Sequence, residues 1–325
     1  MTFDTSVRGI YRPRRKRSGK PPPFQLTDRD LEILRAVARY RFLDSGHIRL
    51  LIDGSERNLA NRLKGLFEHA YLDRPECQYD FYRPGGGSSL TVYALSDKGA
   101  RVLAHHDALE FGPRVSWAHK NRKVGRPFLE HTLAISDFAV VLSAAVATNP
   151  VVELTDGQEL VSRLPATTRD AAKPFRLSVP VYFKSARHTI GLEPDYVFSL
   201  GFPTAGRRAY FLVEIDRGTM PVERSDILQS SILRKFLTYG AAWQSKLHSQ
   251  KFGWRNFRVL IVTGNAERAE NMQEVLKRQT GGKGSPLFWF ADTETLKRDD
   301  ILNHNWLDGE GNERKLLPAW SSEQT

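Results

Sequence analysis

Residues 193–219 contain two short apolar segments that are bordered by acidic side chains. The sequence EPDYVFSL is followed by the polar stretch GFPTAGRR and then by AYFLVEIDRGT, so Asp195 begins the first segment, whereas Glu214 and Asp216 end the second. Two adjacent antiparallel strands joined by a short turn would bring these three carboxylates to the same edge of a sheet. Because neighbouring carboxylates repel one another, the pattern predicts a divalent metal or a set of cations beside them.

The charge and composition of the chain limit its partners and its compartment. The chain has 325 residues, 40% of them hydrophobic, which is enough for two domains with their own cores. A formal charge of +11 and a pI near 9.7 predict a polyanionic partner. The single cysteine, Cys77, fits a reducing compartment. Since no apolar run approaches the roughly 18 residues of a membrane span, and no signal peptide is evident, we expect a soluble, cytoplasmic protein without a membrane partner.

Residues 1–25 are strongly basic and are predicted to form a flexible arm. The sequence RGIYRPRRKRSGK is followed by three prolines and has too few apolar side chains to build a core. We expect its cations to lie on DNA phosphates, namely Arg14, Arg15, Lys16 and Arg17. The alternative is a solvated tail that only improves solubility.

Residues 26–108 have the pattern of a winged helix-turn-helix domain. Thr27 is a good N-cap for a first helix, a short second helix is expected over 45–52, and Ser55 caps a third helix. Strands near 71–72 and 90–95 enclose a loop that carries Arg83, and Ser96 caps a further helix. The polar face of the third helix carries side chains that suit base edges and phosphates, namely Arg57, Asn58, Asn61, Arg62 and Lys64. The alternative is a winged helix that contacts a protein.

Residues 109–126 are rich in glycine, proline and cations and are predicted to form a linker. Residues 127–300 then alternate helical and strand patterns, which predicts an α/β sheet covered by helices. The expected helices span 127–148, 222–248 and 266–279. The expected strands include 151–154, an edge strand at 176–183, the two acidic strands, and the apolar segments NFRVLIVTG and PLFWFAD. Residues 301–325 are expected to form a tail that lies against the sheet or against a second subunit.

The order of these elements resembles the core of the PD-(D/E)xK nuclease-like superfamily, which has a restriction-endonuclease-like fold. Together with LTDRDLEIL, LEHTLAISD and VEIDRGT, residues 26–306 look like the replication-relaxation family of plasmids and other mobile elements. This resemblance implies a DNA-binding accessory protein, with a relaxase or replication proteins as protein partners. It does not supply a reaction.

The acidic edge departs from the nuclease pattern at one position. Where an active nuclease would have Glu-x-Lys, this chain has Glu214-Ile215-Asp216. Lys235, in the next helix and four residues before Tyr239, could replace the missing lysine. A catalytic site would then consist of Glu130, Asp195, Glu214 and Lys235, and Mg²⁺ or Mn²⁺ would bind Asp195, Glu214 and Asp216. The alternative is a buried ion network in which Asp216 pairs with Arg217, Arg234 or Lys235.

Three functions are consistent with these patterns. The first is a sequence-selective DNA-binding accessory protein of a mobile element, with a non-catalytic nuclease-like domain. The second is a metal-dependent endonuclease or nickase, and the third is a transcription regulator that binds DNA as a homodimer. A phosphate-binding glycine loop, a paired CxxC and a nucleophile elbow are all missing from the sequence, which argues against ATP use and structural zinc.

Overall fold

The computed structural model describes residues 16–79, 90–107, 121 and 123–318, and Arg14, Arg15 and Arg83 therefore lie outside the described residues. The chain divides into two compact units, residues 1–140 and residues 141–325. The division falls inside helix α6 (Arg126–Ala147), whereas the sequence analysis set the boundary before this helix. Both units combine helices with β-sheet, so the predicted mixed α/β class is confirmed.

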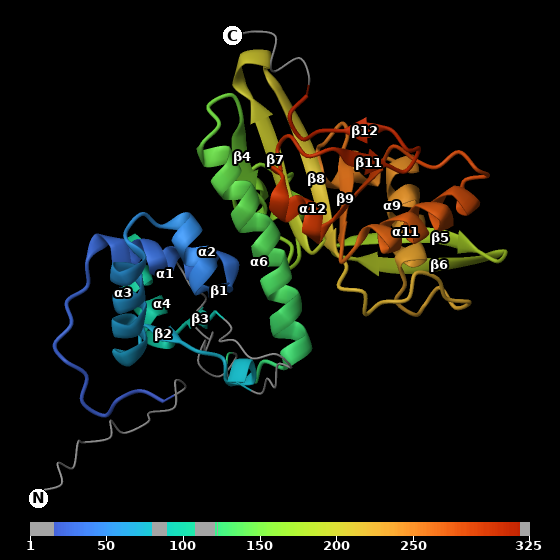
Figure 1. Ribbon diagram of the computed structural model, residues 1–325. Helices are drawn as coiled ribbons and strands as arrows, with labels where there is room; N and C mark the ends of the chain where they lie inside the picture. The colour runs from blue at the N-terminus through green and yellow to red at the C-terminus, as the bar shows by residue number, and fades with distance from the viewer. Residues whose placement is uncertain (1–15, 80–89, 108–120, 122, 319–325) are drawn as a thin grey trace, which may run out of the picture. The chain divides into compact units, whose positions relative to one another are not determined.

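The first unit packs its helices around a small antiparallel sheet in the order β1-β3-β2 (Figure 1). Its helices and strands are α1 (Asp28–Tyr40), β1 (Phe42–Asp44), α2 (Ser45–Leu51), α3 (Glu56–Glu68), β2 (Leu72–Asp73), the short helix η1 (Glu76–Tyr79), β3 (Val92–Leu95) and α4 (Asp97–Asp107).

Polar side chains begin the helices of this unit where the sequence indicates. The Asp30 carboxylate accepts hydrogen bonds from the backbone N–H and hydroxyl of Thr27, which begins α1. The Asp44 side chain caps α2, and the Ser55 hydroxyl accepts from the Asn58 N–H at the start of α3. The inner faces of α1 and α3 then supply the core, with Leu34, Val37, Leu59, Leu63 and Leu66 all buried.

The second unit is built on a seven-stranded sheet in the order β12-β11-β10-β9-β8-β7-β4. Strands β8, β9 and β10 are parallel, whereas the remaining pairs are antiparallel. The strands of this sheet are β4 (Glu153–Asp156), β7 (Tyr196–Phe202), β8 (Arg207–Ile215), β9 (Arg258–Thr263), β10 (Phe288–Asp292), β11 (Trp306–Asp308) and β12 (Glu313–Arg314). The two acidic segments of the sequence are therefore neighbouring antiparallel strands, β7 and β8, as predicted.

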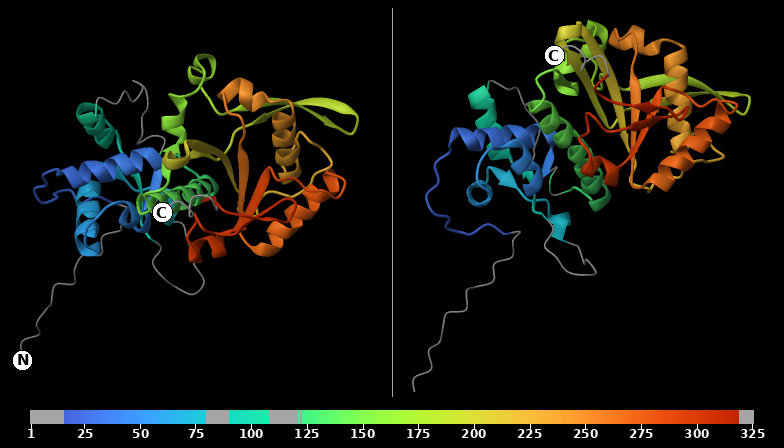
Figure 2. Two further views of the ribbon diagram at one scale, coloured as in Figure 1. Left: turned by 90° about the horizontal axis from the view of Figure 1, so that it is seen from above. Right: turned by 45° about the horizontal axis from the view of Figure 1, so that its top comes forward.

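Helices cover this sheet, and a separate hairpin packs beside them. The helices are α7 (Gly157–Val161), α8 (Ala166–Arg169), α9 (Ile232–Gln244), α10 (Leu247–Phe252), α11 (Ala266–Gln279) and α12 (Thr293–Arg298), and η2 (Pro203–Ala205) joins β7 to β8. The main core lies between α9 and α11 and the face of the sheet that carries Leu212, Ile261 and Phe290. The hairpin of β5 (Leu177–Phe183) and β6 (Ala186–Leu192) packs against α9 (Figures 1 and 2).

The structure differs from three sequence-based expectations in this unit. The helix predicted over 222–248 begins only at Ile232, because the Ser231 side chain caps it after an irregular loop. The strand at 176–183 pairs with β6 in its own sheet, and β6 was not predicted. The tail after residue 300 adds β11 and β12 to the main sheet and buries Trp306 completely, because its isolated apolar side chains fill the core.

Helix α6 is, among the described residues, the one helix long and apolar enough to cross a membrane by length and composition. The helix contains few charged residues, but polar residues interrupt its apolar ones. It therefore does not stand out in the sequence as a continuous apolar run. Several of its side chains, including Leu129, Phe138 and Val140, are buried inside the folded chain. Of its most apolar stretch, 39% is buried inside the folded chain.

Candidate functional site

The predicted acidic edge forms where β7 begins and β8 ends. The Asp195 N–H donates to the Val213 carbonyl at 3.0 Å, and the Asp195 carboxylate accepts from the Ile215 N–H at 2.8 Å. These two hydrogen bonds hold Asp195 beside the last residues of β8, next to Glu214. Glu214 itself lies on the face of the sheet that α9 covers, and it is only 1% exposed.

Two side chains from one turn of α9 engage both oxygens of the Glu214 carboxylate. The Lys235 ammonium forms an ion pair with Oε2, and the Tyr239 hydroxyl donates to Oε1 at 2.5 Å. Lys235 and Tyr239 are four residues apart and therefore lie on the same face of the helix. The structure thus has Lys235 next to Glu214, as the sequence predicted, and Tyr239 binds the other oxygen of this carboxylate.

Burial sets the charges of this cluster. Burial raises the pKa of Glu214 to about 7, and the positive charge of Lys235 opposes the rise. Burial would lower the pKa of Lys235, but the negative charges of Glu214, Asp195 and Asp216 outweigh it and raise that pKa. Burial also raises the pKa of Tyr239 well above its ordinary value, so its hydroxyl remains a donor at neutral pH.

Asp216 belongs to a second network at the end of β8. The Arg268 guanidinium donates to both of its oxygens, at 2.5 and 2.9 Å, and the Thr263 hydroxyl and the Gly218 N–H donate to Oδ2. Arg268 also donates to the Met220 carbonyl at 2.5 Å and so fixes the loop that leaves the strand. Arg268, which the sequence analysis did not consider, is therefore a cation that neutralises Asp216.

The sequence pattern did not identify Arg268 as a partner of Asp216, although the sequence contains a signal for its position. Asn265 caps α11 and puts Arg268 in the first turn of this helix, directly after β9. Because β9 runs parallel to β8, residues that follow either strand lie at the same edge of the sheet. The parallel pairing of two strands separated by more than 40 residues is what the sequence pattern did not indicate.

The carboxylates in this arrangement do not fit a divalent metal. Both oxygens of Glu214 and both oxygens of Asp216 bind cationic or hydroxyl donors, and Asp195 accepts a backbone N–H. Mg²⁺ is usually held by one or two protein carboxylates in octahedral geometry, and these carboxylates would have to exchange their present donors for the metal. Within the described ranges, no group of three His, Cys, Asp or Glu side chains could hold a metal ion. Glu130, the fourth residue of the predicted catalytic set, belongs to the first unit, where it pairs with Arg126 at 2.7 Å.

Helix α3 of the first unit presents most of the predicted DNA-contacting side chains to solvent. Arg57, Asn58, Asn61 and Lys64 are exposed, while the opposite side of the helix is in the core. Arg62 differs, because its guanidinium is bound by the fully buried Asp30 carboxylate and by the Gln25 carbonyl. Arg62 therefore supports the fold of the first unit, which leaves the four exposed side chains as the candidates for DNA contact.

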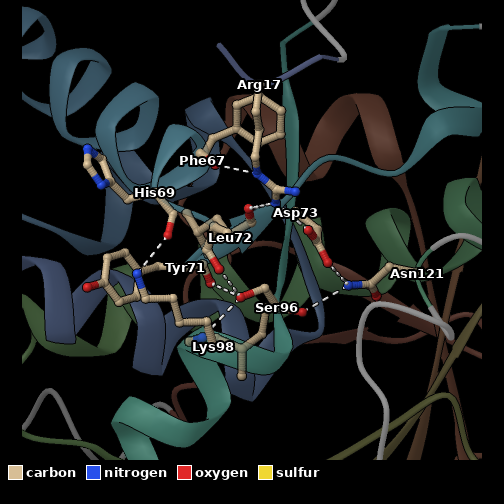
Figure 3. Close-up of polar contacts among 12 residues, drawn as sticks. Arg17, Phe67, His69, Tyr71, Leu72, Asp73, Ser96, Lys98 and Asn121 are labelled. Atoms are coloured by element: carbon tan, nitrogen blue, oxygen red, sulfur yellow. Dashed lines mark hydrogen bonds and ion pairs between the residues drawn. The ribbon is translucent and has the colours of Figure 1, made fainter. Parts of the chain in front are cut away.

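Residues 16–25, here called the N-terminal segment, are bound to the first unit and are not a free arm. Arg17 donates to the carbonyls of Phe67 and Leu72 at 2.7 and 2.9 Å and to the Asp73 carboxylate at 2.6 Å (Figure 3). The Ser18 N–H and hydroxyl both donate to the Glu68 carboxylate. Burial would raise the pKa of Glu68, but these two hydrogen bonds lower it. Arg17 thus anchors the segment, whereas Lys16 remains exposed.

The N-terminal segment and α3 enclose a basic groove of about 670 Å³. The side chains that line this basic groove include Lys16, Lys20, Asn61, Lys64, Glu68 and Arg74. Phe24 closes one side by stacking on His69 at 5.1 Å. Among the described residues of the lining, Glu68 is the one acidic side chain, and because Ser18 holds it, the charge that these residues present to solvent is positive.

The fold and these two sites define a mixed α/β protein in which one unit carries a basic groove and the other a buried network of carboxylates and cations. The family model described as replication-relaxation matches residues 34–255. The chain belongs to this family, as the sequence analysis predicted, and membership indicates a role connected with replication or mobile elements. No curated protein and no solved structure matches the chain.

Proposed function

We propose that the first unit binds duplex DNA, with α3 as the recognition helix of a winged helix-turn-helix. The observation that carries this proposal is the basic groove, in which Lys16 and Lys20 of the N-terminal segment face the same space as Lys64 of α3. A recognition helix in the major groove needs cations at its flank to bind the adjacent phosphates. Lysines held beside the helix meet this requirement.

The exposed side of α3 supplies the groups that would read bases. Arg57 suits the acceptor atoms of guanine, and Asn58 and Asn61 suit adenine. The net charge of +11 agrees with a polyanionic partner. We accordingly propose that the chain acts in replication or in the maintenance of a mobile element by occupying specific DNA sites.

The second unit, in this proposal, has a nuclease-like fold but no catalytic role. Lys235 neutralises Glu214 and Arg268 neutralises Asp216, which is the pattern of ion networks that brace a sheet. A metal-dependent endonuclease would need these carboxylates to be available to Mg²⁺, and their hydrogen bonds argue against it. Binding as a homodimer, and contact with a relaxase or replication proteins, remain predictions from the sequence.

Sequence preference provides the test of this proposal. The full chain and its variants would select sites from a randomised duplex library. Arg57→Ala and Asn61→Ala should relax the selected sequence, with a loss of discrimination of about 1–3 kcal/mol at the contacted base pair. Arg62→Ala should instead lower stability, since it leaves the Asp30 carboxylate buried and unpaired. Identical preferences for the parent, Arg57→Ala and Asn61→Ala would contradict a recognition role for α3.

A further inference from the structure

A second cationic groove, here called the arginine groove, lies in the second unit. It encloses about 640 Å³, a size that suits a small ligand or part of a polymer. Its lining comes from the first half of β8, from the loop before β9 and from β10, and it includes Arg208, Tyr210, Asn256, Arg255, Arg258 and Trp289. The part of the chain that the structure describes contributes no aspartate or glutamate to this lining.

The three guanidinium groups of this groove have no carboxylate partner among the described residues. Arg208 donates to the hydroxyls of Thr155 and Ser199, at 2.8 and 2.7 Å, and both acceptors are neutral. Arg258 donates to the Phe257 carbonyl at 2.9 Å. Arg255 is exposed, and within the described ranges no hydrogen bond or ion pair engages its side chain. Guanidinium groups without a counter-charge favour the binding of an anion.

Arg258 is half-buried, so its guanidinium group has the greater need of a bound anion. Burial lowers its pKa, the neighbouring Arg314 lowers it further, and Asp308 acts in the opposite direction. The Asp308 carboxylate cannot serve as a partner, because it accepts hydrogen bonds from Arg314 at 2.8 Å and from the N–H groups of Glu310 and Asn312. A bound anion would supply the charge that Arg258 lacks.

Aromatic side chains in the same groove indicate what kind of anion fits. Trp289 is half-buried, its indole N–H donates to the Pro286 carbonyl, and its ring meets Phe211 edge-on. Tyr210 stacks on Trp254 with a centroid separation of 4.4 Å, which fixes the ring of Tyr210 at the wall. Held aromatic rings beside unpaired arginines form the combination that binds the bases and phosphates of unpaired strands. In a duplex, the base faces are already stacked and cannot reach such rings.

We propose that the arginine groove binds single-stranded nucleic acid, with phosphates on Arg255 and Arg258 and a base against Trp289. The strand register puts Trp289 level with Val213 and Arg258 level with Phe211, so both side chains lie on the face of the sheet opposite Glu214. The proposed site is therefore separate from the carboxylate network. It also does not depend on duplex binding by the first unit.

The test compares the affinities of the full chain for a fluorescein-labelled oligothymidylate of about 12 nucleotides and for a mixed-sequence duplex, by fluorescence anisotropy. Trp289→Leu should weaken oligothymidylate binding about 5- to 100-fold. Arg255→Ala should weaken it too and reduce the slope of log affinity against log salt by about 0.7. Duplex affinity should be unchanged in both variants. Arg187→Ala is the matched control, because Arg187 is an exposed arginine of β6 that does not line the groove.

Two results would overturn the proposal. One is oligothymidylate binding by Trp289→Leu and Arg255→Ala that equals binding by Arg187→Ala, with all three folded as judged by circular dichroism. The other combines two observations: polyglutamate at equal charge displaces the oligonucleotide, and Trp289→Leu binds the oligonucleotide as tightly as the parent. Together these observations would indicate that the groove binds an acidic protein. Because Lys20→Ala and Lys64→Ala are expected to affect the duplex alone, failure here is distinguishable from failure of the proposed function.

Discussion

At the scale of single residues, burial decides what the acidic side chains of this chain can do. Glu214 and Asp216 are two residues apart, yet one contacts a lysine and a tyrosine of α9 and the other an arginine of α11. Each carboxylate has lost most of its contact with water, and each has a cation in return. Removal of one partner of such an ion pair would leave a buried charge without compensation. This destabilises the fold more than replacement of both partners by apolar residues.

The raised pKa of Glu214 predicts a specific dependence of stability on pH. Its folded-state pKa of about 7 exceeds the ordinary value of 4.5. The folded state therefore binds this proton more tightly than the unfolded state. The resulting stabilisation is complete below pH 4.5 and is lost as the pH rises through 7, by about 3 kcal/mol in total.

Chemical denaturation between pH 4.5 and 8 can measure this effect. The free energy of unfolding of Glu214→Gln should lack this decrease, because the amide does not titrate. Glu193→Gln, which removes a more exposed carboxylate from the segment between β6 and β7, should retain the decrease. A parallel pH dependence in the parent and Glu214→Gln would show that Glu214 does not bind the proton.

At the scale of elements, the N-terminal segment and α3 depend on each other. Phe24 lies so close to Gly65 that any Cβ at this position would overlap the Phe24 ring. Glycine weakens a helix, and Gly65 lies in the last turn of α3, where the Phe24 ring occupies the space that a Cβ would need. The segment in turn brings Lys16 and Lys20 to the basic groove.

Gly65→Ala should therefore release the N-terminal segment although alanine favours the helix. The expected result is faster amide hydrogen exchange over residues 18–25, where the Ser18 N–H binds Glu68. Gly240→Ala is the matched control, since Gly240 lies in α9 with nothing within 4 Å of the added Cβ. It should stabilise the protein by about 0.5–1 kcal/mol and leave exchange in the segment unchanged. Unchanged exchange in Gly65→Ala would mean that Phe24 does not hold the segment.

At the scale of the whole molecule, local patterns predicted much of the fold and of the carboxylate edge. The spacing of apolar side chains and the capping residues Thr27 and Ser55 identified the helices of the first unit, because these signals act within a few residues. The short turn between β7 and β8 likewise predicted their pairing. The sequence did not predict the ion pairs and hydrogen bonds between residues that are far apart in the chain. These are the contacts of Arg268 with Asp216, of Arg62 with Asp30, and of Arg17 with the end of α3.

The arginine groove illustrates the same limit. Arg208, Arg258 and Trp289 are spread over more than 80 residues, and only the parallel alignment of β8, β9 and β10 brings them together. Individually, each resembles an ordinary surface or core residue. The two proposed nucleic-acid sites therefore differ in origin, since the first follows from one helix and its flank and the second from sheet topology.

The central claim is that the first unit binds duplex DNA through the basic groove, and the salt dependence of duplex affinity tests it most directly. Affinity would be measured by anisotropy at several salt concentrations for the parent, for Lys20→Ala/Lys64→Ala, and for Arg101→Ala. Arg101 is an exposed cation of α4 that does not line the groove. The double variant should lose about 0.9 of the log–log slope for each phosphate contact removed, while Arg101→Ala keeps the parental slope. Equal affinities and equal slopes for all three proteins would contradict the account.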